Sequence, residues 1–276
     1  MVFKNAVKSY WGSYLIPIAK LFFLNKDKIQ NNYYPYLTDC QYCIDCNSVM
    51  PRYEFSAEEL SQLYHDYRME SYNKERISFE PSYKKIAKIV GVTDTEISYR
   101  NSKSSELIMR NSSLLTEGYV LDLGGADGMF IPQIIKDKYE TIDLFDISNV
   151  KINSVLENTK IVKIKSLKKD HYSFLMNMHV LEHVGNPLAY FKEMVALVKR
   201  GGSIYLEFPL ELSIDIENIF LKRIIDEPIM IHEHINKFSR KSIIGLLEAV
   251  PNCKLIDSLV DVFESYILAR YIIKVQ

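Results

Sequence analysis

The sequence has few of the features that mark several classes of protein. Its 276 residues include four cysteines, too few for a disulfide scaffold. No stretch reaches the roughly 18 uninterrupted apolar residues that a membrane-spanning helix needs. Lysine and arginine total 34 against 35 aspartates and glutamates, so charge gives no reason to expect nucleic acid as a partner. Internal repeats and low-complexity tracts are also absent, which excludes a solenoid.

What remains is the composition of an ordinary globular protein, with 47% hydrophobic and 25% charged residues. The length predicts one main domain with an appendage rather than two equal halves. The low cysteine content and the lack of an evident cleavage site near the N-terminus favour a cytoplasmic location.

Residues 1–30 are basic and apolar and contain a single acid, Asp27. Their apolar residues recur at helical spacing, which predicts a helix with an apolar stripe that includes Tyr14, Leu15 and Ile18. Docking of this stripe onto the body of the protein is the favoured interpretation. Contact with a membrane surface is the alternative.

The chain divides into an extension, residues 1–92, and a main domain, residues 93–276, with an insertion at residues 209–238. In the extension, Ser56 followed by acidic residues predicts the start of a helix. The main domain alternates strands and helices. Strands are expected at 119–123, 141–145, 160–164, 173–178, 203–208, 254–262 and 265–274, and helices at 93–113, after 129, at 148–158, 187–199 and 239–250.

This alternation predicts an α/β fold: a doubly wound, Rossmann-like sheet of seven mostly parallel strands, with helices on both faces and a mainly helical N-terminal extension. Ligands of such sheets bind at the carboxyl ends of the strands. Residues 209–238 follow one of these ends, so we expect the insertion to cover that edge.

The most informative segment runs from Asp122 to Gly128, at the end of an apolar strand. Gly124, Gly125 and Gly128 let a ligand approach the backbone closely, and a helix is expected to follow. The two carboxylates, Asp122 and Asp127, repel phosphate and favour a ligand that brings amines and hydroxyls.

Asp146 ends the next expected strand. An acid at that place accepts hydrogen bonds from the two hydroxyls of a ribose. A glycine turn alone also serves packing, but the turn, the acid and the order of strands together favour a nucleoside-containing ligand.

The segment Asp122-x-Gly124-Gly125-x-Asp127-Gly128 resembles the first motif of the class I S-adenosylmethionine-dependent methyltransferases. The resemblance implies that this motif holds the methionine part of the cofactor, and that Asp146 holds the ribose. It also assigns Ile147 and His179 to the cofactor site.

A second segment, His179-Val180-Leu181-Glu182-His183, is similar to the signature of a subgroup with His-x-Leu-Glu-His after the fourth strand. Leu206-Glu207-Phe208-Pro209 and the segment from His232 to Ser239 match further motifs of that group. The leader from Cys43 to Tyr83 looks like that of bacterial methyltransferases from surface-sugar and natural-product clusters. The resemblance therefore implies a sugar or sugar-derived acceptor, such as a nucleotide sugar or glycan.

Leaders of this kind often begin with cysteine knuckles that bind zinc. Here Cys40, Cys43 and Cys46 are one ligand short of the four that a closed site needs. We therefore expect a degenerate knuckle and no metal ligands, with zinc as the alternative.

A hydroxyl acceptor has to lose its proton before it attacks a methyl group, and histidine titrates near neutral pH. The candidate bases are His183, after the fourth strand, and His232 or His234 in the insertion. For each of them a structural role is the competing interpretation. In a further alternative, His179, Glu182 and His183, spaced i, i+3 and i+4, bind a divalent metal that orients the acceptor.

The sequence thus predicts an S-adenosylmethionine-dependent methyltransferase that acts on oxygen of a sugar or sugar-derived molecule in bacterial surface-polysaccharide synthesis. Another acceptor, such as a quinone-like ring, an amine or a sugar carbon, is one alternative. A non-catalytic module that binds a partner through its N-terminal segment is the other.

Overall fold

The computed structural model describes residues 14–16, 37–43, 45–51, 56–67, 69–79, 83–86, 88, 93–153, 161–211, 229–230, 234–263 and 266–276. Predictions for other residues, including most of residues 1–30, most of the insertion and His232, lie outside this part of the chain. Within it, no helix combines the length and the apolar character needed to span a membrane.

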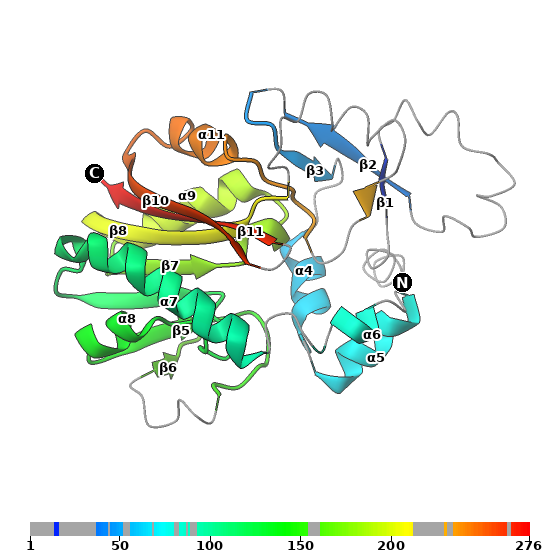
Figure 1. The fold of residues 1–276 in the computed structure, drawn as a ribbon, viewed down its shortest axis with the longest axis horizontal. Coiled ribbons are helices and arrows are strands. Elements are labelled where there is room, and N and C mark those ends of the chain that lie inside the picture. The colour runs from blue at the N-terminus through cyan, green and yellow to red at the C-terminus, as the bar shows by residue number, and fades with distance from the viewer. Residues whose placement is uncertain are drawn as a thin grey trace, which may run out of the picture.

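The main domain is built on a sheet of seven strands, as the alternating sequence predicts. The order across the sheet is β10-β11-β8-β7-β4-β5-β6 (Figure 1). All neighbouring pairs from β6 to β8 are parallel, and β11 runs antiparallel to both β8 and β10. The strands are β4 (Tyr119–Leu123), β5 (Ile142–Phe145), β6 (Ile161–Lys163), β7 (Tyr172–Met178), β8 (Val198–Pro209), β10 (Cys253–Phe263) and β11 (Tyr266–Val275).

The order of the strands reverses at the pair of β4 and β7, in the centre of the sheet. From β4 the chain crosses to β5 on one side, whereas β7 pairs with β4 on the other side. The loops after β4 and β7 therefore diverge at a switch point, where sheets of this kind bind their ligands.

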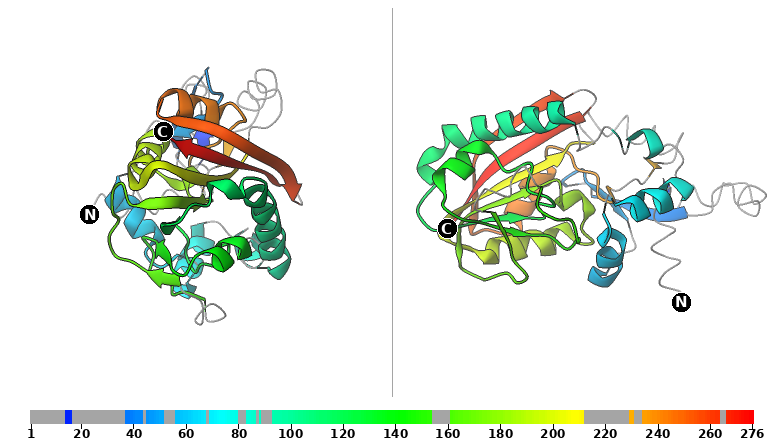
Figure 2. Two further views of the ribbon diagram at one scale, coloured as in Figure 1. Left: turned by 90° about the vertical axis from the view of Figure 1, so that its left-hand side faces the viewer. Right: turned by 90° about the horizontal axis from the view of Figure 1, so that it is seen from below.

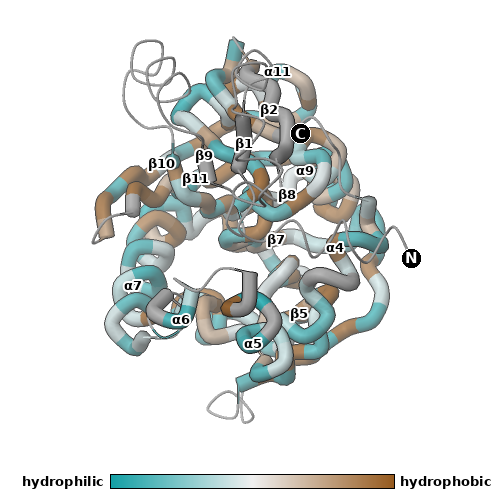
Figure 3. Tube along the Cα trace, turned by 90° about the vertical axis from the view of Figure 1, so that its right-hand side faces the viewer, coloured by the Kyte–Doolittle hydropathy of each residue, from teal (hydrophilic) through white to brown (hydrophobic). Residues whose placement is uncertain are grey.

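Helices cover both faces of the sheet because its side chains alternate between them. Val120 and Tyr205 pack with α7 (Asp94–Arg110) and α8 (Gln133–Lys138) on one face. Leu121 and Leu206 pack with α9 (Pro187–Leu197) and α11 (Ser242–Glu248) on the other (Figure 2). Figure 3 shows hydrophilic colouring along the exposed side of α7, as expected for a helix that buries only one stripe. The described part of the domain also contains the short 3-10 helices η1 (Ser112–Leu114) and η3 (Leu181–His183).

The N-terminal extension contains strands as well as the expected helices. The strands β1 (Tyr14–Ile16), β2 (Leu37–Tyr42) and β3 (Val49–Pro51) form a second sheet of order β3-β2-β1-β9, in which β9 (Ile229–Met230) comes from the insertion. The helical prediction is therefore wrong for residues 14–16, where pairing with β2 and β9 determines the conformation. The helices are α4 (Ala57–Tyr64), α5 (Glu70–Phe79) and α6 (Tyr83–Ile86).

The predicted start of α4 is confirmed by its cap. The Ser56 side chain accepts from the Glu59 backbone N–H, and the Glu59 carboxylate accepts from the Ser56 N–H in return. Figure 1 places this helix beside the carboxyl ends of the parallel strands. The division between residues 92 and 93 stays a prediction.

The helix predicted at 148–158 is wrong for its first residues, which are irregular from Ser148 to Asn153. The backbone N–H groups there serve tertiary contacts instead of a helix: Asn149 donates to the His65 carbonyl, and Asn153 donates to the Asp127 carbonyl. The helix expected after residue 129 begins only at Gln133, with Pro132 at its N-cap.

Candidate active site

The end of β4 places Asp122 inside the protein, directly below the glycine turn. Its side chain is 1% exposed, and neither carboxylate oxygen has a hydrogen-bond partner among the described residues. Burial, together with the nearby charges of Asp146 and Asp127, raises the pKa of Asp122 to about 8. A buried acid without a partner is costly, so this carboxylate is placed to receive a donor from a ligand.

The two adjacent glycines are required by the space around the turn. A Cβ atom on Gly125 would overlap the Asp122 carboxylate, and one on Gly124 would overlap the Val180 side chain from the loop after β7. Gly124 also has a positive φ of 79°, which favours glycine. The turn therefore brings bare backbone next to the switch point, as predicted.

Asp146 lies at the end of β5, and backbone N–H groups of the glycine turn and of its own loop hold its side chain in place. Its Oδ2 accepts from the Ala126 N–H at 2.8 Å, and its Oδ1 accepts from the Ser148 N–H at 2.7 Å. Each carboxylate oxygen can accept more than one hydrogen bond, so both retain capacity for ligand hydroxyls. Ile147 follows in the same loop, and its side chain is 51% exposed.

The helix start that sequence reasoning placed at the glycine turn is not there, because α8 begins only at Gln133. The N–H groups of the turn are used locally instead. Asp127 Oδ1 accepts from the Met129 N–H, and the Gly125 carbonyl accepts from the Gly128 N–H. The site therefore offers acidic acceptors rather than a helix N-terminus.

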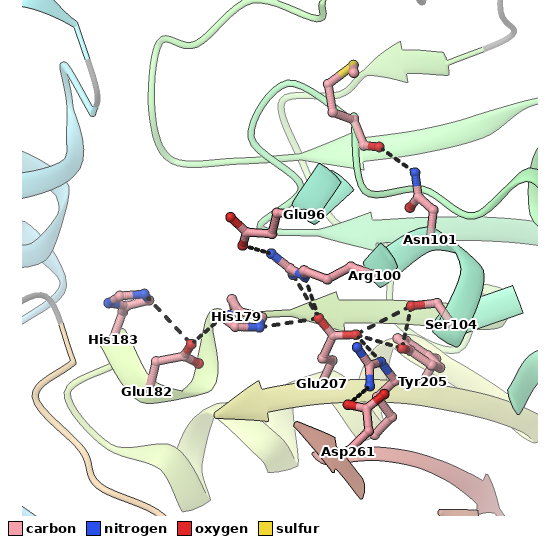
Figure 4. Close-up of polar contacts among 12 residues, drawn as sticks. Glu96, Arg100, Asn101, Ser104, His179, Glu182, His183, Tyr205, Glu207 and Asp261 are labelled. Carbon is pink, nitrogen blue, oxygen red and sulfur yellow. Dashed lines mark hydrogen bonds and ion pairs between the residues drawn. The ribbon is translucent and has the colours of Figure 1, made fainter. Parts of the chain in front are cut away.

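A cluster of acid and imidazole groups lies beyond β7. Glu182 and His183 come from η3, and His234 comes from the C-terminal end of the insertion. The Glu182 carboxylate is fully buried, and its Oε1 lies 3.9 Å from Nε2 of His183 and 3.9 Å from Nε2 of His234. Figure 4 shows His183 on one side of Glu182 and His179 on the other.

The outer nitrogens of both imidazoles meet partners from other elements. Tyr64, on α4 of the extension, places its hydroxyl 3.2 Å from Nδ1 of His183. Glu211 Oε2 lies 3.4 Å from Nδ1 of His234, and the Lys237 ammonium donates to the other oxygen of Glu211. The cluster therefore joins the extension, the insertion and the loop after β7.

These contacts set the charges of the cluster. Burial opposes ionisation of Glu182, but His179, His183 and His234 hold its pKa at about 2. Burial likewise opposes ionisation of Glu211, but Lys237 and His234 bring its pKa to about 2. Burial lowers the pKa of His234, but Glu211 and Glu182 outweigh it and raise the pKa. His234 therefore binds a proton more readily than a free histidine does.

The segment that carries His234 is held against η3 by Asn236. The Asn236 side chain donates to the Val184 carbonyl at 2.7 Å, and its backbone N–H donates to the Glu182 carbonyl at 3.0 Å. The described end of the insertion thus folds over the carboxyl edge of the sheet, as expected.

His179 lies beside Glu182, as the i, i+3 spacing predicts, and it also reaches a second carboxylate. Its Nδ1 lies 3.3 Å from Glu182 Oε1, and its Nε2 lies 3.2 Å from Glu207 Oε1, so the ring spans two buried carboxylates (Figure 4). The backbone of His179 has a positive φ of 55° and donates its N–H to the Glu207 carbonyl. His179 therefore contacts the same Glu182 oxygen that His183 and His234 approach, and it links this carboxylate to Glu207.

Glu207 is the centre of a buried ionic network that sequence reasoning missed. It accepts from Arg100 on α7 and from Arg270 on β11, each at 2.8 Å, and from the Tyr205 hydroxyl. These guanidiniums hold the pKa of Glu207 well below its usual range, although burial opposes this. The signal in the sequence was a charged residue inside the apolar strands β8 and β11, where only a paired charge is tolerated.

The cysteines lie where the extension contacts the main domain. The Ser239 hydroxyl donates to the Cys46 carbonyl, and a Cβ on Gly245 of α11 would lie 3.0 Å from Cys46 Cβ. Cys43 and Cys46 are free thiols, and among the side chains that the structure describes no cysteine joins a group that could hold a metal. Cys40 lies in β2, and its side chain is outside the described part.

The structure thus brings the candidate residues into two neighbouring groups. Asp122, Gly124, Gly125, Asp127, Gly128, Asp146 and Ile147 surround the turn after β4, whereas His179, Glu182, His183 and His234 gather after β7. Comparisons with known proteins bear on the family and the fold. A model of the methyltransferase domain family matches residues 97–250. No curated protein matches the chain in sequence.

Several solved structures share the fold. The 1,6-didemethyltoxoflavin-N1-methyltransferase of Burkholderia thailandensis, solved with 1,6-didemethyltoxoflavin and S-adenosylhomocysteine (SAH), has a TM-score of 0.53 and 11% identity over 86% of this chain and 99% of that chain. The magnesium protoporphyrin IX methyltransferase of Synechocystis PCC 6803, solved with SAH, has a TM-score of 0.52 and 13% identity over 79% of this chain and 100% of that chain.

A SAM-dependent methyltransferase of Leishmania major has a TM-score of 0.51 and 10% identity over 79% of this chain and 82% of that chain. At these identities the structures support the fold, whereas the family model covers more than half of the sequence. The chain therefore belongs to the methyltransferase domain family.

Proposed function

We propose that the protein is an S-adenosylmethionine-dependent methyltransferase that acts on a hydroxyl oxygen of a small molecule. The observation that carries the proposal is the buried carboxylate of Asp122, which has no partner among the described residues and lies below bare glycine backbone. The family assignment and the solved relatives that hold SAH support the same cofactor.

The residues at the switch point fit this cofactor. Asp122 would accept from the ammonium group of the methionine part, which would relieve the cost of the buried acid. Gly124 and Gly125 let the backbone of the turn lie directly against Val180 and Asp122. Asp146 would accept from the ribose hydroxyls, and Ile147 and His179 would line the same site, with Asp127 and Gly128 shaping the turn.

S-adenosylmethionine supplies a methyl group on a positively charged sulfur, and a hydroxyl acceptor then needs only alignment and the loss of its proton. We assign the removal of this proton to the cluster after β7, where His183 and His234 are the catalytic residues. His232 is a third candidate from the sequence. Tyr64 brings the extension into the site by holding His183, and it would keep the imidazole in one orientation.

The finer proposal is a sugar or sugar-derived acceptor from bacterial surface-polysaccharide synthesis. It is supported by the resemblance of the leader and of the His-x-Leu-Glu-His segment. The low cysteine content supports a cytoplasmic reaction. The acceptors named for the solved relatives, a toxoflavin precursor and a porphyrin, are not sugars, so the fold by itself does not select the acceptor.

The test is a methyl-transfer assay with S-adenosylmethionine that carries a labelled methyl group. Nucleotide sugars, amines and quinone-like rings serve as acceptors, and the wild-type protein is compared with His183→Ala and His234→Ala. We expect label on a sugar oxygen, and turnover reduced at least a hundredfold in His183→Ala or His234→Ala. Label on a nitrogen or carbon atom would show that the acceptor is not a sugar hydroxyl. Unchanged turnover in both variants would remove the histidine assignment.

A further inference from the structure

The point between Glu182, His183 and His234 has the chemistry of a metal site. Each residue offers one ligand atom, and the three atoms all lie within 4.8 Å of one another. Among the described residues, these three form the group of histidine, cysteine and acidic side chains that could hold an ion. The arrangement differs from the sequence alternative, because His234 from the insertion takes the place of His179.

Glu182 provides an independent observation. Its side chain is fully buried, and neither carboxylate oxygen meets the geometry of a hydrogen bond within the described structure. Two imidazole Nε2 atoms lie 3.9 Å from the same oxygen, too far for hydrogen bonds. A cation at about 2.1 Å from each atom would need only small side-chain movements to reach all three.

The outer contacts of the three residues are those that metal ligands usually have. A ligating histidine commonly binds a carboxylate or another polar group through its second nitrogen, which leaves the first nitrogen's lone pair for the metal. His234 meets Glu211 through Nδ1, and His183 meets Tyr64 through Nδ1. His179 lies 3.3 Å from Glu182 and links it to Glu207.

We propose that Glu182, His183 and His234 bind one divalent transition-metal cation. Two imidazoles and one carboxylate suit Mn²⁺, Fe²⁺, Co²⁺ or Zn²⁺ better than Mg²⁺ or Ca²⁺, which prefer oxygen ligands. Three protein ligands leave positions open for the oxygen of an acceptor. This role rests on the proposed function and refines it. With a cation bound, His183 and His234 would hold the metal instead of taking the proton themselves, and the metal-bound hydroxyl, with its lower pKa, would pass its proton to water.

The experiment is a titration of the full-length, chelator-treated protein with Co²⁺, followed by visible absorption. It is performed in the variant Cys40→Ser, Cys43→Ser, Cys46→Ser, so that binding by these cysteines cannot contribute. The same background then carries Glu182→Gln, His234→Ala, Glu211→Gln or His65→Ala. His65 is the matched control, because its ring is 61% exposed and lies outside the cluster.

We expect one equivalent of Co²⁺ to bind to the triple cysteine variant and to give visible d–d absorption bands. The His65→Ala control should bind Co²⁺ in the same way. Binding is lost in Glu182→Gln and His234→Ala, and it weakens about tenfold in Glu211→Gln, which removes only an outer contact. Circular dichroism checks that each variant folds. His234→Ala removes a partly exposed ring, so it provides the test if Glu182→Gln does not fold.

Absence of saturable binding in the background protein, or unchanged binding in His234→Ala, would overturn the proposal. The titration uses the metal alone, so its result does not depend on cofactor or acceptor. Failure of the proposed function would appear separately, as absence of SAH binding.

Discussion

At the scale of single residues, Asp122 shows how a functional group destabilises the protein that carries it. The carboxyl group is buried without a partner, and its pKa is about 8. In the unfolded chain it ionises near pH 4, whereas in the folded protein it stays protonated up to about pH 8. Unfolding therefore releases a proton in this window, and the contribution of Asp122 to the free energy of unfolding falls as pH rises from about 4 to 8.

The variant Asp122→Asn should separate stability from binding. An amide does not ionise, so the melting temperature of the variant relative to wild type should increase from pH 5 to pH 8.5. SAH binding should be lost, because the amide cannot pair with the ammonium group. Thermal unfolding at several pH values and calorimetry check both effects. Asp170→Asn, at an exposed acid with positive φ that asparagine also tolerates, is the control. A difference in melting temperature that stays the same at every pH would contradict this assignment of the Asp122 pKa.

At the scale of elements, Glu207 connects α7, β8 and β11 by accepting from Arg100 and Arg270. Replacing it by Gln would remove the buried charge that the two guanidiniums share, leaving Arg100 with Glu96 and Arg270 with Asp261. We expect Glu207→Gln to lower the free energy of unfolding by on the order of 3–5 kcal/mol, measured by urea denaturation. Glu106→Gln, which removes an exposed ion pair with Lys103, should leave the midpoint unchanged. Equal midpoints for the two variants would show that the network contributes little.

A second contact between elements positions the cluster. Asn236 holds the end of the insertion against the loop after β7, two residues from His234. We expect Asn236→Ala to reduce turnover about tenfold or more by displacing His234, while SAH affinity stays as in wild type. Steady-state kinetics and calorimetry measure the two quantities. Asn252→Ala, at an exposed asparagine in the turn between α11 and β10, should change neither. A loss of SAH affinity equal to the loss of turnover would indicate a general structural effect instead.

At the scale of the whole molecule, the main-domain fold was predictable because its elements repeat one local pattern. Apolar strands such as Tyr119–Leu123 end at glycine, and Asn186 and Pro187 mark the start of a helix. The failures lie where contacts distant in sequence decide. Residues 14–16 pair with β9 from the insertion, and residues 148–153 give their backbone donors to His65 and Asp127. A prediction made from neighbouring residues cannot include partners so far away in the sequence.

For the candidate site, the position of the residues along the sheet edge was predictable, but the orientation of their side chains was not. Strand ends meet at one edge of a parallel sheet, so Asp122 and Asp146 had to lie near each other. Spacing could not show that His179 reaches Glu207 as well as Glu182, or that His234 approaches Glu182, because the orientation of a ring after a turn depends on packing. Arg100 and Arg270 were missed for the same reason. Their partner is one carboxylate that is more than 60 residues away from each of them in the sequence.

The most direct test of the account is calorimetric titration of the folded protein with S-adenosylmethionine and SAH, in wild type and in Asp146→Ala. Asp146 bonds the Ala126 and Ser148 N–H groups, so circular dichroism is used to confirm that the variant folds. We expect both compounds to bind saturably at one site in wild type, with affinity at least tenfold weaker in Asp146→Ala. Absence of binding in folded wild-type protein would contradict it and would favour a partner-binding module built on the methyltransferase fold.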